Sequence, residues 1–269
     1  KRIALGGIIM TVIMFSGCST IVQNLEIGEE KTLETGKTEQ ESVTEKDINM
    51  NEKESFNAES NINDVIHDSA FDDYGRLIFP VDMEIEDNLN LKDVSSTDKT
   101  VEIVNYMKNQ AMNGEQIFYP IYSEEEMQAD ADKKDTGLFF FQGNAGAKTT
   151  IINAGGGFVY VAGIHDSFPH ALELSKKGYN AFALIYRPGA QTACEDLSKA
   201  IAFISDHAEE LQVDPDDYSL WGGSAGARMA AWVGTYGTSA FGEKEYPAPT
   251  AVIMQYTGLS EITGEEPPT

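Results

Sequence analysis

A serine flanked by glycines is the most chemically suggestive feature of this chain, which reads Gly222-Gly223-Ser224-Ala225-Gly226. The pattern G-x-S-x-G is typical of a nucleophile elbow, a tight turn that presents a serine hydroxyl between a strand and a helix. Glycines at 222 and 226 suit such a turn because it leaves little room for side chains. The alternative interpretation is that Ser224 only caps the following helix. A nucleophilic role also requires a general base, normally a histidine held by a carboxylate.

No such base follows Ser224, because the rest of the chain contains neither histidine nor aspartate. Upstream, His165 and His170 follow a glycine-rich stretch and could approach the serine, although a histidine at a helix end or on a rim is commoner. His67 precedes the expected fold, and His207 falls late on an amphipathic segment. The residues before Ser224 therefore suggest no strong candidate for the base.

A second glycine-rich stretch lies about 70 residues before the serine, where residues 153–161 read NAGGGFVYV. It follows a short apolar segment. Three consecutive glycines allow backbone amides to approach a substrate oxygen closely. The amide of Ala225, at a predicted helix start, can likewise point at an oxyanion that develops beside Ser224.

Alternating strands and helices are expected to position these two motifs. The patterns predict strands at 115–122, 137–143, 149–157, 180–187, 218–223 and 250–257, and helices at 100–114, 167–178, 192–212 and 224–237. Ser167 is the predicted N-cap of its helix. Such alternation indicates an α/β fold with a mostly parallel sheet covered by helices on both faces.

The two glycine motifs together resemble those of the α/β-hydrolase superfamily. Within it, they are similar to esterases related to hormone-sensitive lipase and to bacterial acetyl-xylan-type esterases, whose signature is H-G-G-G-x or P-G-G-G-x followed later by G-x-S-A-G. The resemblance covers roughly residues 137–269 and includes the segments YRPG at 186–189 and VDPDDYSLWGGSAG before the serine.

This resemblance implies a role for each motif residue. Ser224 would be the nucleophile, and the N–H groups of Gly156, Gly157 and Ala225 would form the oxyanion hole. Ala154 occupies the position at which many relatives have a histidine that organises the loop. That departure weakens the lipase-like assignment rather than the catalytic interpretation.

The resemblance also implies a place for the missing base. In this fold the triad acid and histidine follow the serine along the chain, on loops after later strands. The sequence ends 45 residues after Ser224, at a Pro-Pro segment of the kind that leads into the acid-bearing strand in relatives. We therefore expect a sheet truncated before its last strands, with the triad acid and histidine beyond Thr269. The chemistry needs no metal and no organic cofactor.

The N-terminus resembles that of a bacterial lipoprotein. A basic pair and an apolar stretch lead to Phe-Ser-Gly-Cys, which predicts a signal peptide at 1–18 and lipidation of Cys18. An ordinary signal peptide or a short anchor with an incidental cysteine is the alternative. The lipid would anchor the exported protein to the outer face of the cytoplasmic membrane. Residues 19–64 are expected to form a disordered acidic tether, with helix as the alternative.

The remaining chain divides into residues 65–135, an N-terminal extension with lead-in strands, and 136–269, the hydrolase core. The net charge of −25 argues against nucleic acid as a partner. Two cysteines imply no disulfide framework, and Cys194 is expected to be a packed thiol. Arg187 is expected to pair with a buried carboxylate, and Asp196 to act structurally in the first turn of its helix.

The sequence thus predicts a serine hydrolase for a small-molecule carboxylic ester, with short acyl groups such as acetyl favoured. Two alternatives stay open. One is a peptidase of the same superfamily, and the other is a non-catalytic cell-surface binding lipoprotein that keeps the fold without the triad. No pattern indicates an oligomeric state.

Overall fold

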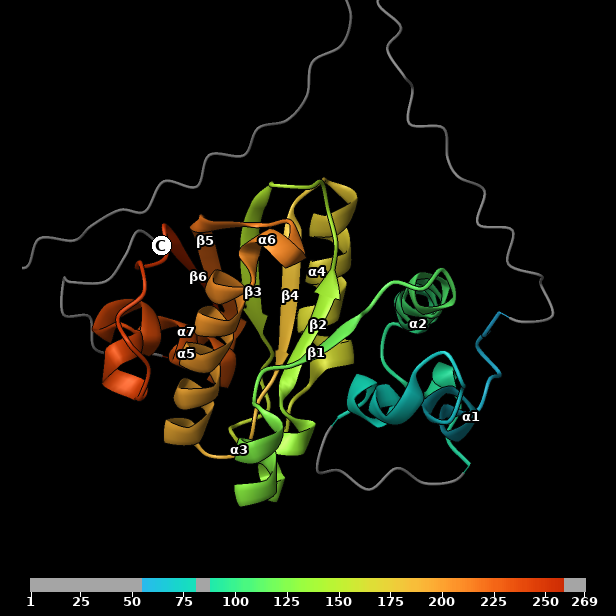
Figure 1. Cartoon of the computed structure of the whole chain (residues 1–269). Helices are drawn as coiled ribbons and strands as arrows, with labels where there is room; N and C mark the ends of the chain where they lie inside the picture. The colour runs from blue at the N-terminus through green and yellow to red at the C-terminus, as the bar shows by residue number, and fades with distance from the viewer. Residues whose placement is uncertain (1–54, 81–87, 259–269) are drawn as a thin grey trace, which may run out of the picture. The chain divides into compact units, whose positions relative to one another are not determined.

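The computed structural model describes residues 55–80 and 88–258 (Figure 1). The predicted signal peptide with Cys18, the tether up to residue 54 and the C-terminal residues 259–269 lie outside the described residues. Across the described part of the chain, no helix combines the length and apolar character needed to cross a membrane.

Six strands of the described chain form one mixed sheet in the order β1-β2-β4-β3-β5-β6. They are β1 (Phe118–Pro120), β2 (Gly137–Phe141), β3 (Lys148–Asn153), β4 (Asn180–Ile185), β5 (Asp214–Gly223) and β6 (Ala251–Gln255). Strands β3, β4, β5 and β6 run parallel, whereas β2 pairs antiparallel with both β1 and β4. The expected parallel core is confirmed, with an antiparallel edge beside it.

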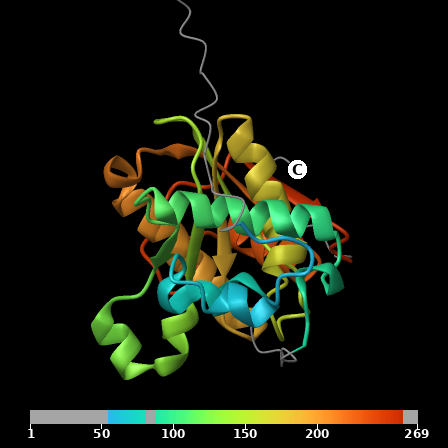
Figure 2. The same ribbon diagram turned by 90° about the vertical axis from the view of Figure 1, so that its right-hand side faces the viewer.

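Helices cover both faces of this sheet, as the alternating pattern predicted. The α-helices of the described chain are α1 (Ile62–Ile66), α2 (Thr97–Met112), α3 (Glu124–Ala129), α4 (Ser167–Lys176), α5 (Ala190–Asp206), α6 (Ala208–Leu211) and α7 (Ala225–Tyr236), and α4, α5 and α7 pack on the strands. Figure 1 shows α5 and α7 together on one side of the sheet and α4 on the other. Helix α2 packs on α4 and, in the turned view of Figure 2, crosses in front of it.

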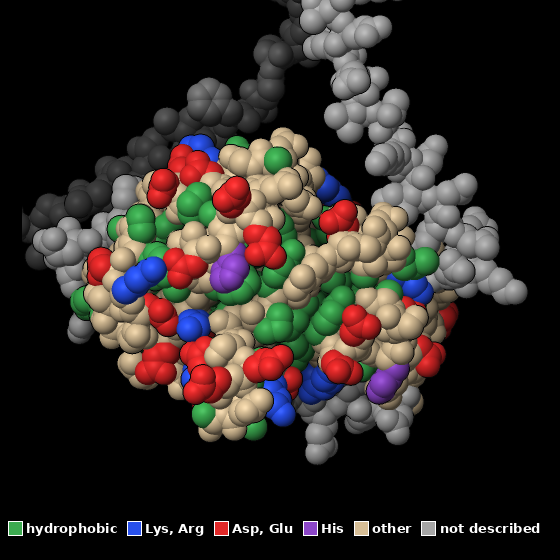
Figure 3. Space-filling model, in the orientation of Figure 1, with side chains coloured by type: hydrophobic (Ala, Val, Ile, Leu, Met, Phe, Trp, Pro, Cys, Tyr) green, Lys and Arg blue, Asp and Glu red, His purple; other side chains and the backbone are tan. Residues whose placement is uncertain are grey.

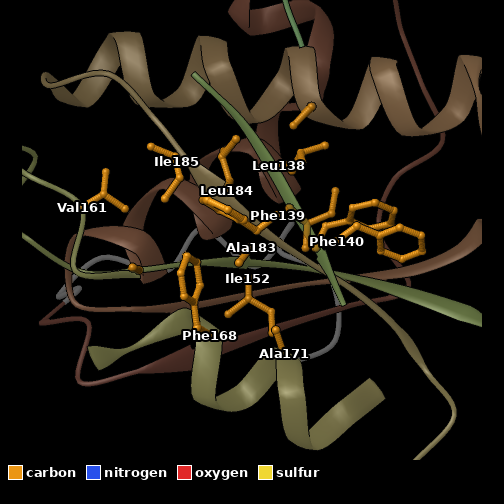
Figure 4. Close-up of a cluster of buried hydrophobic side chains, with 14 of the residues drawn as sticks. Leu138, Phe139, Phe140, Ile152, Val161, Phe168, Ala171, Ala183, Leu184 and Ile185 are labelled. Carbon is orange, nitrogen blue, oxygen red and sulfur yellow. The ribbon is translucent and has the colours of Figure 1, made fainter. Parts of the chain in front are cut away.

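The core lies between the central strands and the helices. Every residue of β2 and β4 is buried, as expected for strands that are covered on both faces. Figure 4 shows Phe168 and Ala171 of α4 directed at the strand residues Phe139 and Ile152. The Phe139 and Phe168 rings meet edge to face with their centroids 5.0 Å apart. Each such buried side chain contributes about 1.5–3 kcal/mol, so the sheet is firmly held beneath the site.

The predicted tether boundary at residue 64 is wrong, because residues 55–64 belong to the fold. Asn105 on α2 holds both backbone groups of Phe56: the Phe56 N–H donates to Asn105 Oδ1, and Asn105 Nδ2 donates to the Phe56 carbonyl, each at 2.9 Å. Ile62 is buried, and Asn61 caps α1. His67 ends α1 and so also lies within the fold. These contacts join residues far apart in sequence, which no local pattern reveals.

The acidic connection at 123–135 is mostly exposed and partly helical. Ser123 and Glu126 form a capping box at the start of α3, so each side chain satisfies a free amide of the other. A 3-10 helix follows at Ala131–Asp135. Figure 3 shows acidic side chains spread over the visible face rather than gathered at one place.

Candidate active site

Three parallel strands of the sheet end at one edge, and each is followed by a residue of the site. Asn153 at the end of β3 pairs with Gly222 in β5, and Gly223 pairs with Gln255 at the end of β6. The glycine loop, Ser224 and Tyr256 therefore emerge side by side. Ligands of α/β sheets bind outside the carboxyl ends of the strands, which is where this edge lies.

Ser224 has a backbone conformation that is rare for a side-chain-bearing residue, with φ 51° and ψ −113°. Such a conformation costs of order 1–3 kcal/mol, and it persists only where the surroundings impose it. Here its N–H donates to the Gln255 carbonyl at 3.0 Å, so the neighbouring strand helps to hold the turn. The side chain is half-buried. This strained turn between a strand and a helix is the geometry that a nucleophile elbow requires.

Glycine is required on both sides of the turn. A methyl group on Gly222 would overlap the backbone of Gly226, and one on Gly226 would overlap the Asn153 carbonyl oxygen. The start of α7 can therefore approach the end of β5 only without a side chain at position 222, and the end of β3 only without one at position 226. This confirms the steric reason for the G-x-S-x-G spacing.

The alternative role for Ser224, helix capping, is not supported by its contacts. Ser224 does occupy the N-cap position of α7, but its side chain makes no capping hydrogen bond. Capping serines normally have extended backbone angles and accept from an amide two or three residues on. The Ser224 hydroxyl is therefore not used to stabilise the helix.

The glycine loop lies directly against this serine. A methyl group on Gly155 would stand 3.2 Å from the Ser224 Cβ. Gly156 and Gly157 both have positive φ, 137° and 66°, which turn the loop sharply after β3. Neither amide donates a backbone hydrogen bond to another part of the described chain. The Ala225 amide is likewise in a first helical turn, where amides have no partner inside the helix.

Comparison with known families agrees with this geometry. The model of the BD-FAE family, which is of the α/β-hydrolase type, matches residues 140–262, a segment that contains both the glycine loop and the elbow. With the strand order, the two-sided helical cover and the elbow, this decides the architecture. The fold is that of an α/β hydrolase.

Among solved structures, this hydrolase fold is similar to esterase 2 of Thermogutta terrifontis. The apo form is 22% identical with a TM-score of 0.42, over 51% of this chain and 53% of that chain. The native form is 20% identical with a TM-score of 0.43, over 55% of this chain and 57% of that chain. The chain therefore spans a little over half the length of these esterases. No curated protein matches it.

None of the histidines is hydrogen-bonded to Ser224, and all of them lie within the described residues. His67 and His207 each contact the carbonyl four residues earlier in their own helical segments. His170 on α4 lies beside the Trp221 ring. His165 is closer to the loop, but its Nδ1 is hydrogen-bonded to the Ser95 hydroxyl at 2.8 Å. Burial lowers the pKa of His165.

Two residues that the sequence did not suggest complete the edge of the site. Asp166 Oδ2 accepts a hydrogen bond from the Gly155 amide at 2.7 Å. The hydroxyl of Tyr256, which directly follows β6, lies near Asp166 beside Gly223, and burial together with that carboxylate raises the pKa of Tyr256 to about 12. Asp166, rather than the predicted Ser167, is the N-cap of α4. An aspartate before a helix usually indicates only a cap, so the sequence contained no specific signal for this contact.

Arg187 behaves as predicted, and its partner is Asp196. The Asp196 carboxylate is fully buried and accepts from the Arg187 guanidinium at 2.7 Å and from the Tyr122 hydroxyl at 2.5 Å. Asp196 does not lie in the first turn of its helix, because α5 already begins at Ala190. Arg187 follows β4 at the same edge as Ser224, so this network stiffens the loops around the site.

Within the described residues, no cluster of histidine, cysteine and carboxylate side chains suits a metal ion.

Proposed function

We propose that this chain is a serine hydrolase that cleaves carboxylic esters with short acyl groups, with Ser224 as the nucleophile. The observation that carries the proposal is the strained, half-buried serine at the start of α7 whose hydroxyl makes no capping bond. A fold retains such strain at a functional turn, whereas a purely structural cap has no need of it. The match of residues 140–262 to a hydrolase-type family supports the same chemistry.

The site would act by acyl transfer. Ser224 Oγ attacks the ester carbonyl carbon, and the carbonyl oxygen takes up negative charge beside the amides of Gly156, Gly157 and Ala225. The alcohol leaves as the acyl-enzyme forms, and water then releases the acid. A histidine base must take the serine proton and pass it to the leaving alkoxide. Each oxyanion donor is worth about 2.7–4 kcal/mol of transition-state stabilisation, so the glycine loop is as important as the serine.

The test is hydrolysis of p-nitrophenyl esters of increasing acyl length by the natural full-length polypeptide. Ser224→Ala should lower kcat by about 10⁴-fold or more, as loss of a triad nucleophile does. The matched control is Ser219→Ala, because Ser219 lies on β5, the strand that leads to Ser224, and its hydroxyl accepts from the Trp221 indole. It should retain activity. Acetyl and propionyl esters should be cleaved faster than octanoyl esters.

Other outcomes separate the alternatives. Turnover of peptide substrates in preference to esters, lost in Ser224→Ala, would indicate a peptidase of the same superfamily. No turnover of any ester, with Ser224→Ala and wild type indistinguishable, would indicate a binding protein. Neither alternative is favoured by a specific contact in the described residues.

The proposed location is the outer face of the cytoplasmic membrane, with a lipid on Cys18. Its support is the basic pair, the apolar stretch and the Phe-Ser-Gly-Cys segment that ends at Cys18. A diacylglyceryl group would supply two acyl chains, and two chains hold a protein stably where one does so only marginally. An esterase at this position would meet exported or extracellular esters.

A further inference from the structure

Asp166 is placed to cap helix α4, yet its side chain serves another element. It is the N-cap residue of α4, and its side chain makes no capping hydrogen bond. An aspartate at this position normally accepts from an amide of the first helical turn, which is worth about 1 kcal/mol. The carboxylate instead accepts from the Gly155 amide in the glycine loop at 2.7 Å. The contact to the loop therefore replaces a contact that would have been available locally.

Both backbone groups of Gly155 are held from the same short segment. Asp166 accepts from the Gly155 N–H, and the Ala162 N–H donates to the Gly155 carbonyl at 3.0 Å. The Asp166 backbone is itself held, because its N–H donates to the Ala162 carbonyl at 3.0 Å. This arrangement orients the peptide groups that follow Gly155, and these belong to the glycine loop that carries the amides of Gly156 and Gly157.

The same carboxylate also contacts the elbow and the end of β6. A methyl group on Gly223 would stand 2.6 Å from Asp166 Oδ2 and would overlap the Tyr256 hydroxyl. The same methyl group would thus meet both the Tyr256 hydroxyl and the Asp166 carboxylate, which lie side by side, and Tyr256 has an unusual φ of 38°. One carboxylate thus joins the three chain segments that leave β3, β5 and β6.

We propose that Asp166 is a positioning residue for the hydrolysis, which holds the glycine loop in register with Ser224 and ties it to Tyr256. The inference rests on the proposed function. Its physical reason is that oxyanion donors contribute fully only when they are held in place before the charge develops. The Gly155 amide donates to the carboxylate and the Tyr256 hydroxyl lies beside it, and both polar groups offset its charge close to a site that must bind an oxyanion.

The experiment compares Asp166→Ala, Asp166→Asn and Tyr256→Phe in the natural full-length polypeptide. Asp166→Ala removes the acceptor and should lower kcat by about 10–100-fold with KM within about threefold, since the loop orients transition-state donors rather than the ground state. Asp166→Asn keeps an oxygen acceptor for Gly155 and should restore most of the loss. Tyr256→Phe should have an intermediate effect. The matched control is Asp98→Ala, an exposed aspartate in the first turn of α2.

Amide hydrogen exchange gives a readout that does not depend on turnover. Peptides covering 153–161 should exchange faster in Asp166→Ala than in wild type, while the melting temperature of Asp166→Ala remains near that of Asp98→Ala. Unchanged protection of that loop, or a kcat within threefold of wild type, would overturn the inference. A kcat for Asp166→Asn as low as that of Asp166→Ala would also overturn it, because the charge rather than the acceptor would then matter.

Failure of the proposed function gives a different result. In that case wild type and Ser224→Ala are equally inactive on esters. Failure of the inference alone leaves wild type active, Ser224→Ala inactive and Asp166→Ala active.

Discussion

Replacing Asp196 with alanine should remove a large part of the stability of the fold. The Asp196 side chain is fully buried, and that of Arg187 is only 12% exposed. The substitution removes acceptors for the Arg187 amide at 2.7 Å, for its guanidinium at 2.7 Å and for the Tyr122 hydroxyl at 2.5 Å. Among the described residues, Arg187 then retains Asp130, at 2.9 Å, as its one ion-pair partner.

The expected loss is about 3–5 kcal/mol, because breaking a buried pair leaves the Arg187 charge with only the partly exposed Asp130 to compensate it. A domain has about 5–15 kcal/mol of stability in total, so this is a substantial fraction. With an m-value of about 2 kcal/mol/M, the urea midpoint should fall by about 1.5–2.5 M. Urea unfolding followed by tryptophan fluorescence and by circular dichroism measures this shift.

Glu195→Ala is the matched control, one residue earlier on the same helix. Glu195 is in contact with Gln191 at an exposed position, so its removal should change stability by no more than about 0.5 kcal/mol. An Asp196→Ala midpoint within experimental error of the Glu195→Ala midpoint would refute the reasoning. It would mean that the network contributes no net stability in the fold.

Three further predictions concern other parts of the chain. Gly226→Ala should abolish ester hydrolysis and lower stability by about 1–3 kcal/mol, because its methyl group overlaps the Asn153 carbonyl; a fully active, equally stable variant contradicts this. Burial raises the pKa of Cys194 from 9.0 to about 12. Because the thiolate is the reactive form, a disulfide reagent at pH 8 should label Cys194 roughly 1,000-fold more slowly in the native than in the unfolded protein. The measurement uses a Cys18→Ser background, so that Cys194 is the thiol that reacts. Between pH 9 and 12 the unfolded thiol loses its proton while the native thiol keeps it, so the free energy of unfolding falls as the pH rises through that range, and below pH 9 the effect is absent. Wild type should therefore lose stability more steeply than Cys194→Ala between pH 9 and 12. Cys18→Ala should release the protein from membranes or leave it unprocessed, and fatty-acid labelling that persists in this variant would exclude lipidation at that residue.

Much of the site could be predicted from local patterns. The elbow around Ser224 needs glycine at 222 and 226 for steric reasons that act within five residues, and the structure confirms those reasons. The strands beside it are recognisable because strands covered on both faces are apolar throughout. The N-terminal boundary was predicted wrongly, since residues 55–64 are held by contacts such as that of Phe56 with Asn105, which no periodic pattern encodes.

The sequence by itself therefore determined the chemistry-bearing turn and the alternation of strands and helices around it, because both depend on neighbouring residues. Only the tertiary structure decided which side chains support that turn. Asp166 and Tyr256 lie far apart along the chain and meet because β3, β5 and β6 end at one edge of the sheet. Asp196 was likewise an unremarkable helical carboxylate until folding buried it against Arg187 and Tyr122. Such contacts are set by strand order and register, which bring distant residues together.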